Sequence, residues 1–127
     1  MQINISSMST LAIYEQIVNQ IKDAIIKKEL LPGDAMPSIR NLAKDLQISV
    51  ITTKRAYEEL EKEGLLKSVA GKGFYVCDYN AEFLKEKQSA MLENRLAEVI
   101  RDCIKADIPL EDILDSVKII YDSIKKG

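Results

Sequence analysis

The stretch Leu31-Pro32-Gly33-Asp34-Ala35-Met36-Pro37-Ser38-Ile39-Arg40 decides the fold of this 127-residue chain. Its first four residues predict a turn, because Pro and Gly supply the backbone angles that end a preceding helix. Ser38 then predicts the start of a new helix, since serine is a good N-cap. The inner face of that helix would consist of Ile39, Leu42, Ala43 and Leu46. The stretch therefore predicts a break followed by a short helix.

A second serine predicts a second helix after a short turn at residues 47–48. Ser49 is a good N-cap for a helix that runs to about Glu63, and Gly64 is suited to the position after its end. The buried stripe would comprise Thr53, Ala56, Tyr57 and Leu60, and the outward side chains would be Ile51, Thr52, Lys54, Arg55 and Glu58. The polar leading end of this helix is predicted to face solvent.

A helix and a hairpin flank these two elements. An apolar stripe at helical spacing predicts a helix over residues 10–29, capped by Ser9 or Thr10. Short apolar stretches at 65–69 and 74–77 surround Ala70-Gly71-Lys72-Gly73, which is typical of a β-hairpin. This order of elements predicts a winged helix-turn-helix, in which one helix enters the DNA major groove and the hairpin approaches the backbone.

The residues expected to contact DNA lie at the leading ends of the two short helices and at the hairpin tip. Helix N-termini attract phosphate, and an arginine can bind phosphate or a guanine edge. The candidates are Ser38, Arg40, Ser49, Val50, Ile51, Thr52, Lys54, Arg55, Gly71, Lys72 and Gly73.

Each of these candidates also has a plain structural alternative. Ser49 could serve only as a cap, and the cations after it could form only a solvated face. Arg40 could form a surface ion pair with Asp34 or Asp45. The two glycines around Lys72 could serve turn geometry alone.

Four motifs in this order resemble the N-terminal domain of GntR-family transcription regulators. They are Tyr14-Glu15-Gln16-Ile17, residues 32–43 from Pro-Gly to Leu-Ala, residues 48–65 from Ile-Ser to Gly-Leu, and Gly71-Lys72-Gly73-Phe74-Tyr75-Val76. The resemblance covers about residues 10–78. It implies a DNA-binding transcription regulator, and we expect a homodimeric repressor that binds a palindromic operator.

Two departures from the family pattern concern packing and base contacts. Met36 replaces the usual leucine, which is a tolerated change in a core. Val50 stands where many relatives carry an arginine that contacts bases, and Ile51 occupies the next position. An apolar pair cannot donate to guanine but can pack on thymine methyl groups. We therefore expect a preference for A·T pairs at this place.

The part after residue 78 predicts a dimerisation region. Residues 81–105 and 109–125 carry apolar stripes, with Asp107 or Ile108 as the cap of the second helix and Pro109 at its first position. This short tail resembles the YtrA-type subfamily, which implies a homodimer and often control of transporter operons. The expected interface residues are Leu92, Leu96, Val99, Ile113, Val117 and Ile120. The alternative is that both helices fold back on the N-terminal domain.

The sequence thus predicts a mostly α (α+β) chain with a DNA-binding domain at 1–78 and a helical region at 79–127. The function expected is repression of its own or a transporter operon, and the alternative is a winged-helix adaptor that binds proteins. Because the chain has no histidine, His-dependent triads and C2H2 zinc fingers are excluded, and we expect no enzyme, cofactor or metal.

Charge and cysteine content bear on partners and compartment. The net charge of −2 is not that of a typical nucleic-acid-binding domain, although residues 1–78 are balanced and hold the candidate basic residues. Cys77 and Cys103 are expected to be reduced, half-buried thiols. No signal peptide or membrane-spanning stretch is evident, so a cytoplasmic protein without a membrane partner is expected. No small-molecule effector is indicated by the sequence.

Overall fold

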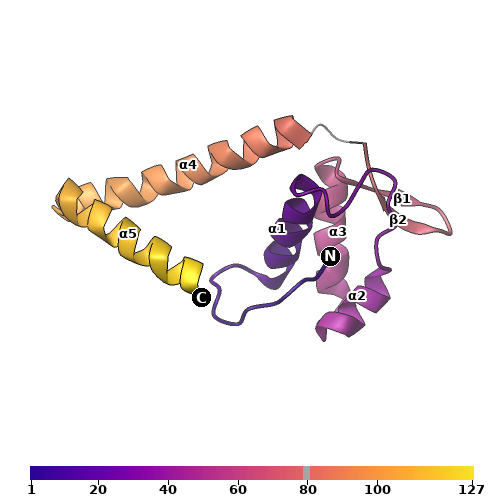
Figure 1. Cartoon of the computed structure of the whole chain (residues 1–127). Helices are drawn as coiled ribbons and strands as arrows, with labels where there is room; N and C mark the ends of the chain where they lie inside the picture. Colours follow the sequence, from indigo (N-terminus) through magenta and orange to yellow (C-terminus); the bar gives the residue numbers. More distant parts are fainter. Residues whose placement is uncertain (79–80) are drawn as a thin grey trace. The chain divides into compact units, whose positions relative to one another are not determined.

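The computed structural model describes residues 1–78 and 81–127, which form two compact units, Met1–Lys85 and Glu86–Gly127. The elements in chain order are α1 (Ile13–Ile26), α2 (Ile39–Leu46), α3 (Val50–Lys62), β1 (Leu66–Val69), β2 (Gly73–Val76), α4 (Ala81–Lys105) and α5 (Leu110–Lys126) (Figure 1). Helices dominate, and the one described sheet is the antiparallel β1–β2 hairpin. The mostly helical, winged helix-turn-helix fold expected from the sequence is confirmed.

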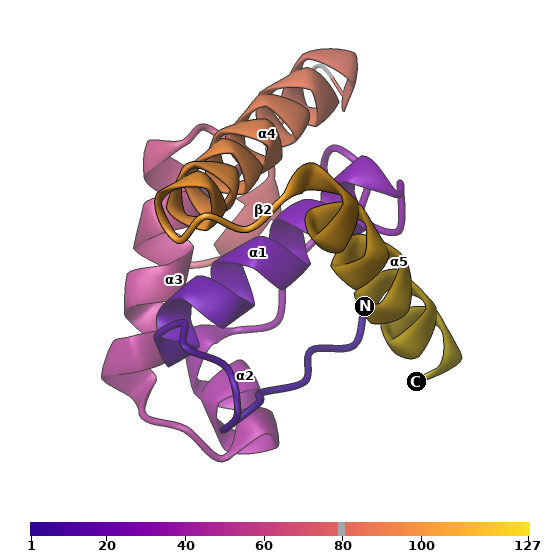
Figure 2. The same cartoon turned by 90° about the vertical axis from the view of Figure 1, so that its left-hand side faces the viewer.

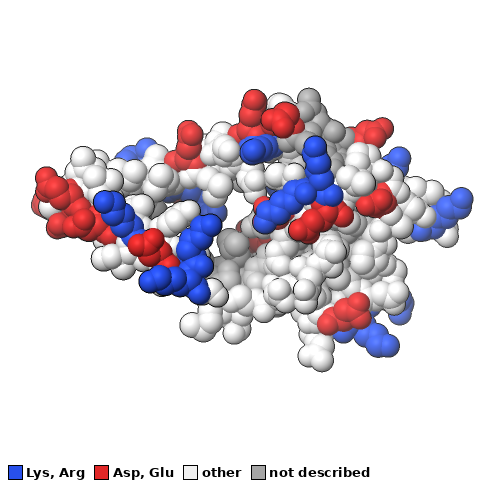
Figure 3. All heavy atoms as spheres, in the orientation of Figure 1, with Lys and Arg blue, Asp and Glu red and all other residues white. Residues whose placement is uncertain are grey.

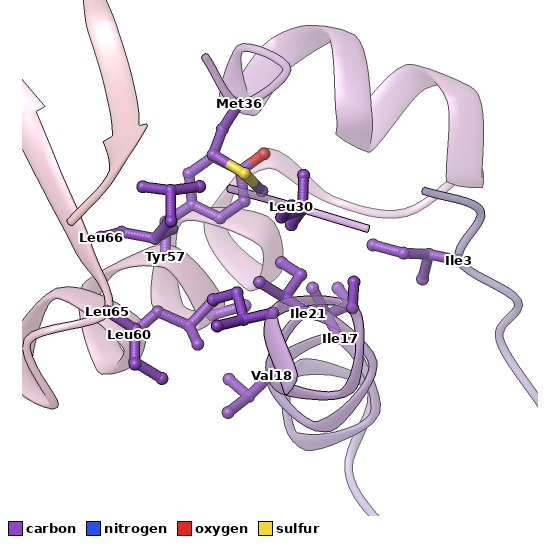
Figure 4. Packing of buried hydrophobic residues seen from close by; sticks show 14 of the residues in the cluster. Ile3, Ile17, Val18, Ile21, Leu30, Met36, Tyr57, Leu60, Leu65 and Leu66 are labelled. Atoms are coloured by element: carbon purple, nitrogen blue, oxygen red, sulfur yellow. The ribbon is translucent and has the colours of Figure 1, made fainter. Parts of the chain in front are cut away.

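The core of the first unit lies between α1 and α3, which are side by side in Figures 1 and 2. Ile17 and Ile21 on α1, Tyr57 and Leu60 on α3 and Leu66 on β1 are buried together. Figure 4 shows side chains from these elements pointing toward one another. Because one face of α3 packs against α1, the opposite face of α3 is exposed to solvent.

The first helix is shorter than its apolar stripe predicted. It begins at Ile13 with Ala12 as N-cap, so the expected caps Ser9 and Thr10 are wrong. The Glu15 carboxylate takes over the role, since it accepts the Ala12 N–H at 3.2 Å. At the other end α1 stops at Ile26, because the chain folds back and two later N–H groups reach the Ala24 carbonyl at 2.8 and 3.2 Å.

The N-terminal segment, residues 3–6, is held on α1 by two glutamines one helical turn apart, and we call this segment the strap. The Gln20 side-chain amide accepts the Asn4 N–H at 2.9 Å and donates to the Asn4 carbonyl at 2.7 Å. Gln16 makes the same pair of bonds with Ser6, at 2.8 and 3.0 Å. Ile3 is buried in the core beside them. The strap is therefore part of the first unit, although no local sequence signal predicted it.

Tyr57 ties three parts of the first unit together. Its hydroxyl donates to the Pro37 carbonyl at 2.7 Å, and its ring meets Phe74 of β2 edge-on, with centroids 5.1 Å apart. Burial raises the pKa of the Tyr57 phenol above its ordinary value, so the hydroxyl stays protonated and able to donate. One side chain thus connects α3 both to the segment before α2 and to the β1–β2 hairpin, which is the wing of this fold.

Replacing Tyr57 by Phe should destabilise the protein without emptying the core. The Pro37 carbonyl would lose its hydrogen bond, which costs about 1–2 kcal/mol of the free energy of unfolding. Urea unfolding followed by circular dichroism would measure the loss. Tyr75→Phe is the matched control, because Tyr75 is a partly exposed tyrosine on β2 of the same unit. Equal stability of the two variants would contradict the role given to the Tyr57 hydroxyl.

The second unit, Glu86–Gly127, consists of α4 from Glu86 onward and the whole of α5. The turn between these helices has Asp107 in the left-handed region (φ 59°), and the Ile108 N–H donates to the Cys103 carbonyl at 3.0 Å. Pro109 is the N-cap of α5, so neither Asp107 nor Ile108 caps it and Pro109 precedes the first helical position. Pro109 serves as the N-cap through its carbonyl, which accepts the first helical hydrogen bonds from the N–H groups of Asp112 and Ile113.

The apolar faces of α4 and α5 are exposed to solvent. No residue of α5 is buried in the described structure, and Leu92, Leu96, Val99, Val117 and Ile120 are each at least half exposed. Cys77 and Cys103 are free and half-buried, as expected. Within residues 1–78 and 81–127, none of the helices combines the length and apolar character needed to span a membrane.

Candidate nucleic-acid interface

Two serine caps set the geometry of the helix-turn-helix. The Ser38 hydroxyl oxygen accepts the Asn41 N–H at 3.1 Å, and the Ser49 hydroxyl oxygen accepts the Thr52 N–H at 3.0 Å. Ser49 also donates to the Thr52 hydroxyl at 2.8 Å. Between the helices, Gln47 takes the left-handed conformation (φ 56°) that ends α2. The caps were predicted correctly, and they fix where the leading end of α3 begins.

An apolar pair forms the start of the outer face of α3. Val50 is 44% exposed and Ile51 is 81% exposed, whereas the neighbouring Thr53 is fully buried. No described side chain covers Ile51, and an isoleucine this exposed gains nothing for folding. The pair therefore offers an apolar contact surface at the end of the helix that a winged helix-turn-helix presents to DNA.

Two exposed cations, one on α2 and one on α3, have few partners among the described residues. Arg40 is exposed on the first turn of α2, and among the described residues it forms no ion pair with Asp34 or Asp45. Asp34 instead accepts the Leu31 N–H at 2.8 Å. Lys54 lies 3.8 Å from Glu58, in a pair whose two side chains are both more than half exposed. Such a surface pair contributes little, so Lys54 can exchange it for a phosphate.

Arg55 has a partner that the sequence did not indicate. Its guanidinium carbon lies 3.8 Å from the centroid of the Tyr14 ring, which comes from the start of α1. Arg55 remains exposed, so the stack holds the side chain without burying its charge.

The wing carries a lysine at its tip. Gly71 (φ 75°) and Gly73 (φ 91°) both adopt backbone angles that favour glycine, so they serve the turn and leave Lys72 exposed between them. Figure 3 shows basic side chains over the projecting end of the hairpin. The wing is also anchored to α3, because the Glu61 carboxylate accepts both the N–H and the hydroxyl of Ser68, at 3.0 and 2.9 Å.

The acidic residues at the far end of α3 are engaged elsewhere. Glu58 pairs with Lys54, Glu59 with Lys62 at 3.9 Å, Glu61 with Ser68, and Glu63 with Lys22 at 2.7 Å. The charges of Glu59 and Glu63 are thus balanced by Lys62 and Lys22, which are not among the proposed DNA contacts, and this weakens the objection raised by the net charge of the chain. Among the described residues no group of His, Cys, Asp or Glu side chains could hold a metal ion.

A helix-turn-helix followed by an anchored hairpin with a basic tip defines a winged helix-turn-helix protein. The family model for bacterial regulatory proteins of the gntR family matches residues 13–76. The chain therefore belongs to the GntR family of transcription regulators.

Similar proteins extend the likeness beyond the DNA-binding domain. The HTH-type transcriptional repressor YtrA of Bacillus subtilis (strain 168) is 34% identical over 125 residues, which cover 98% of this chain and 96% of that protein. The crystal structure of a transcriptional antiterminator from Listeria monocytogenes EGD-e matches with a TM-score of 0.71 at 30% identity, over 100% of this chain and 95% of the other. The resemblance to the short YtrA-type members thus includes the C-terminal helices.

A second similar structure was solved with DNA. The DNA-binding domain of AraR, in complex with operator ORE1, matches with a TM-score of 0.52 at 30% identity, over 61% of this chain and 94% of the other. The B. subtilis relative is named as a transcriptional repressor, and the AraR domain is named as bound to an operator.

Proposed function

We propose that this protein is a homodimeric repressor whose α3 enters the major groove of a palindromic operator. The observation that carries the proposal is the exposed apolar pair Val50 and Ile51 at the start of α3, together with two exposed cations, Arg40 on α2 and Lys54 on α3. Ser38, Ser49 and Thr52 would present their hydroxyls to phosphate at the leading ends of α2 and α3, and the Gly71-Lys72-Gly73 tip would approach the backbone. The AraR complex supports DNA as the ligand of this domain type.

The dimer is proposed to form through residues 79–127, and residues 1–78 are proposed to be the DNA-binding domain. Exposed apolar side chains on α4 and α5 support this, because a surface of this kind in water favours association. The occupant we propose is a second copy of the chain, since a palindromic operator presents two identical half-sites to two identical subunits. The residues proposed for the interface are Leu92, Leu96, Val99, Ile113, Val117 and Ile120.

The regulated genes are proposed to be the protein's own operon or a transporter operon, and the site of action the cytoplasm, where the DNA is. The name of the B. subtilis relative supports repression.

Arg40→Ala and Lys54→Ala should each weaken operator binding while leaving the fold intact, because both side chains are exposed. If each makes one phosphate contact, the slope of log affinity against log salt should flatten by about one unit per contact, and so by about two for a dimer. Fluorescence anisotropy across a salt series would measure both effects.

Lys27→Ala is the matched control, because Lys27 is an exposed lysine that follows the far end of α1. Parental affinity and salt slope in both Arg40→Ala and Lys54→Ala would show that these residues do not contact DNA. If the parent protein itself bound no DNA, the protein-binding adaptor would replace the proposal.

A further inference from the structure

Tyr14 and Arg55 form a contact that joins α1 to the outer face of α3. We propose that Tyr14 is a positioning residue, which holds the Arg55 guanidinium in place to bind a DNA phosphate at the edge of the major groove. The inference rests on the proposed function, and it adds to the interface a residue on α1 that does not itself read bases. The carrying observation is the 3.8 Å distance from the guanidinium carbon to the ring centroid.

Arg55 lies on the same side of α3 as the proposed groove contact. It follows Ile51 by four residues, so the two side chains project from one face, about 6 Å apart along the helix axis. Ile51 is 81% exposed at the leading end of that face. When a helix enters the groove by its leading end, a side chain one turn later lies nearer the rim, where the phosphates are.

The stack leaves the hydrogen-bonding edge of Arg55 available. A guanidinium donates through N–H groups in its own plane, and an aromatic ring covers only a face of that plane. Glu58 and Glu59, which follow on α3, contact Lys54 and Lys62 at 3.8 and 3.9 Å. Among the described residues no carboxylate is recorded in an ion pair with Arg55. The positive charge of Arg55 is therefore not neutralised by an ion pair within the described residues.

The Tyr14 ring is a fixed support for this cation. It is half-buried and packs against the core that α1 shares with α3. A long arginine side chain otherwise loses considerable rotamer freedom when it binds. Because Tyr14 restricts Arg55 before DNA arrives, less of that freedom remains to be lost on binding.

A double-mutant cycle tests the coupling of the two side chains in DNA binding. The variants are Tyr14→Leu, Arg55→Gln and the double variant, with Tyr14→Phe as the matched control that keeps the ring. The probe is a duplex recovered by the parent protein from random-sequence DNA, and affinity is measured across a salt series. Thermal unfolding of each variant shows whether it is folded.

We expect Arg55→Gln to flatten the salt slope by about one unit per subunit. Tyr14→Leu should lower affinity by about two- to tenfold per subunit, the factor that corresponds to immobilising one long side chain on binding. Tyr14→Phe should bind like the parent. Once Arg55 is replaced, Tyr14→Leu should have no further effect on affinity.

Three results would overturn the proposal. They are a parental salt slope in Arg55→Gln, independent effects of the two substitutions on affinity, or a coupling seen in thermal stability but not in DNA binding. The last result would make the stack a purely structural link between α1 and α3. The proposed function fails separately, if the parent recovers no preferred duplex or if Arg40→Ala and Lys54→Ala bind like the parent.

Discussion

A chain ending at Asp78 should bind a palindromic operator at least about a hundredfold more weakly than the whole chain, because it loses the second linked copy. Linkage raises the effective concentration of the second domain at its half-site and commonly gains two to four orders of magnitude in avidity. The fully buried core residues, from Ile3 to Val76, lie within the retained residues. Among the partly buried side chains packed against this core the fragment loses only Leu84, so it should still fold. Sedimentation velocity should find it monomeric, and anisotropy should report its weaker binding.

Point substitutions test the same interface in the full-length chain. Leu96→Gln and Val117→Gln would place an amide in the proposed apolar seam, where it would be desolvated without a partner. Both should shift the protein toward monomer and weaken operator binding. Lys118→Gln is the matched control, since it places the same side chain beside Val117 at an already polar position.

A dimeric fragment ending at Asp78 would contradict the assignment and place the interface within the retained residues, most simply on α1.

The operator should carry A·T pairs beneath the start of α3 in each half-site. Val50 and Ile51 are exposed there and have no donor for guanine, but they can pack on the thymine methyl. Replacing thymine by deoxyuracil removes only that methyl, so each contacted thymine should lose about 0.8 kcal/mol, or about fourfold in affinity. Replacing the pair by G·C should cost about 1–3 kcal/mol.

The control for this experiment is the protein variant Ile51→Ala on the same pair of duplexes. It lacks most of the apolar contact and should discriminate poorly between thymine and deoxyuracil. Guanine-rich sequence beneath the start of α3 in selected operators, or equal binding of the two duplexes by the parent, would contradict the assigned contact.

The parts of the fold that depend on neighbouring residues were predictable from the sequence. Ser38 and Ser49 cap α2 and α3 as expected, because a serine cap bonds an N–H group only three residues ahead. The bounds of α4 agree with the predicted 81–105. The short apolar stretches on either side of Ala70-Gly71-Lys72-Gly73 likewise predicted the hairpin.

The parts that depend on distant residues were not predictable in this way. The segment before α1 is held by Gln16, which bonds Ser6, and by Gln20, which bonds Asn4, and these partners lie 10 and 16 residues apart in the sequence. The start of α1 was misplaced for a local reason, because Glu15 and not a serine or threonine makes the bond at its N-cap. The contact between Tyr14 and Arg55 joins two helices, and only their packing brings the two side chains together. Tyr14 was noted as part of a family motif, but nothing local indicated its partner.

Selection from random-sequence DNA by the full-length protein tests the central claim most directly. The account predicts that sequencing of the bound DNA yields a two-fold symmetric motif with A·T pairs at the α3 contact in each half. It further predicts that this duplex binds at least about a thousandfold more tightly than a scrambled duplex at the same salt concentration. Recovery of no motif, with equal binding to both duplexes, would contradict the claim that this winged helix-turn-helix is a sequence-specific repressor.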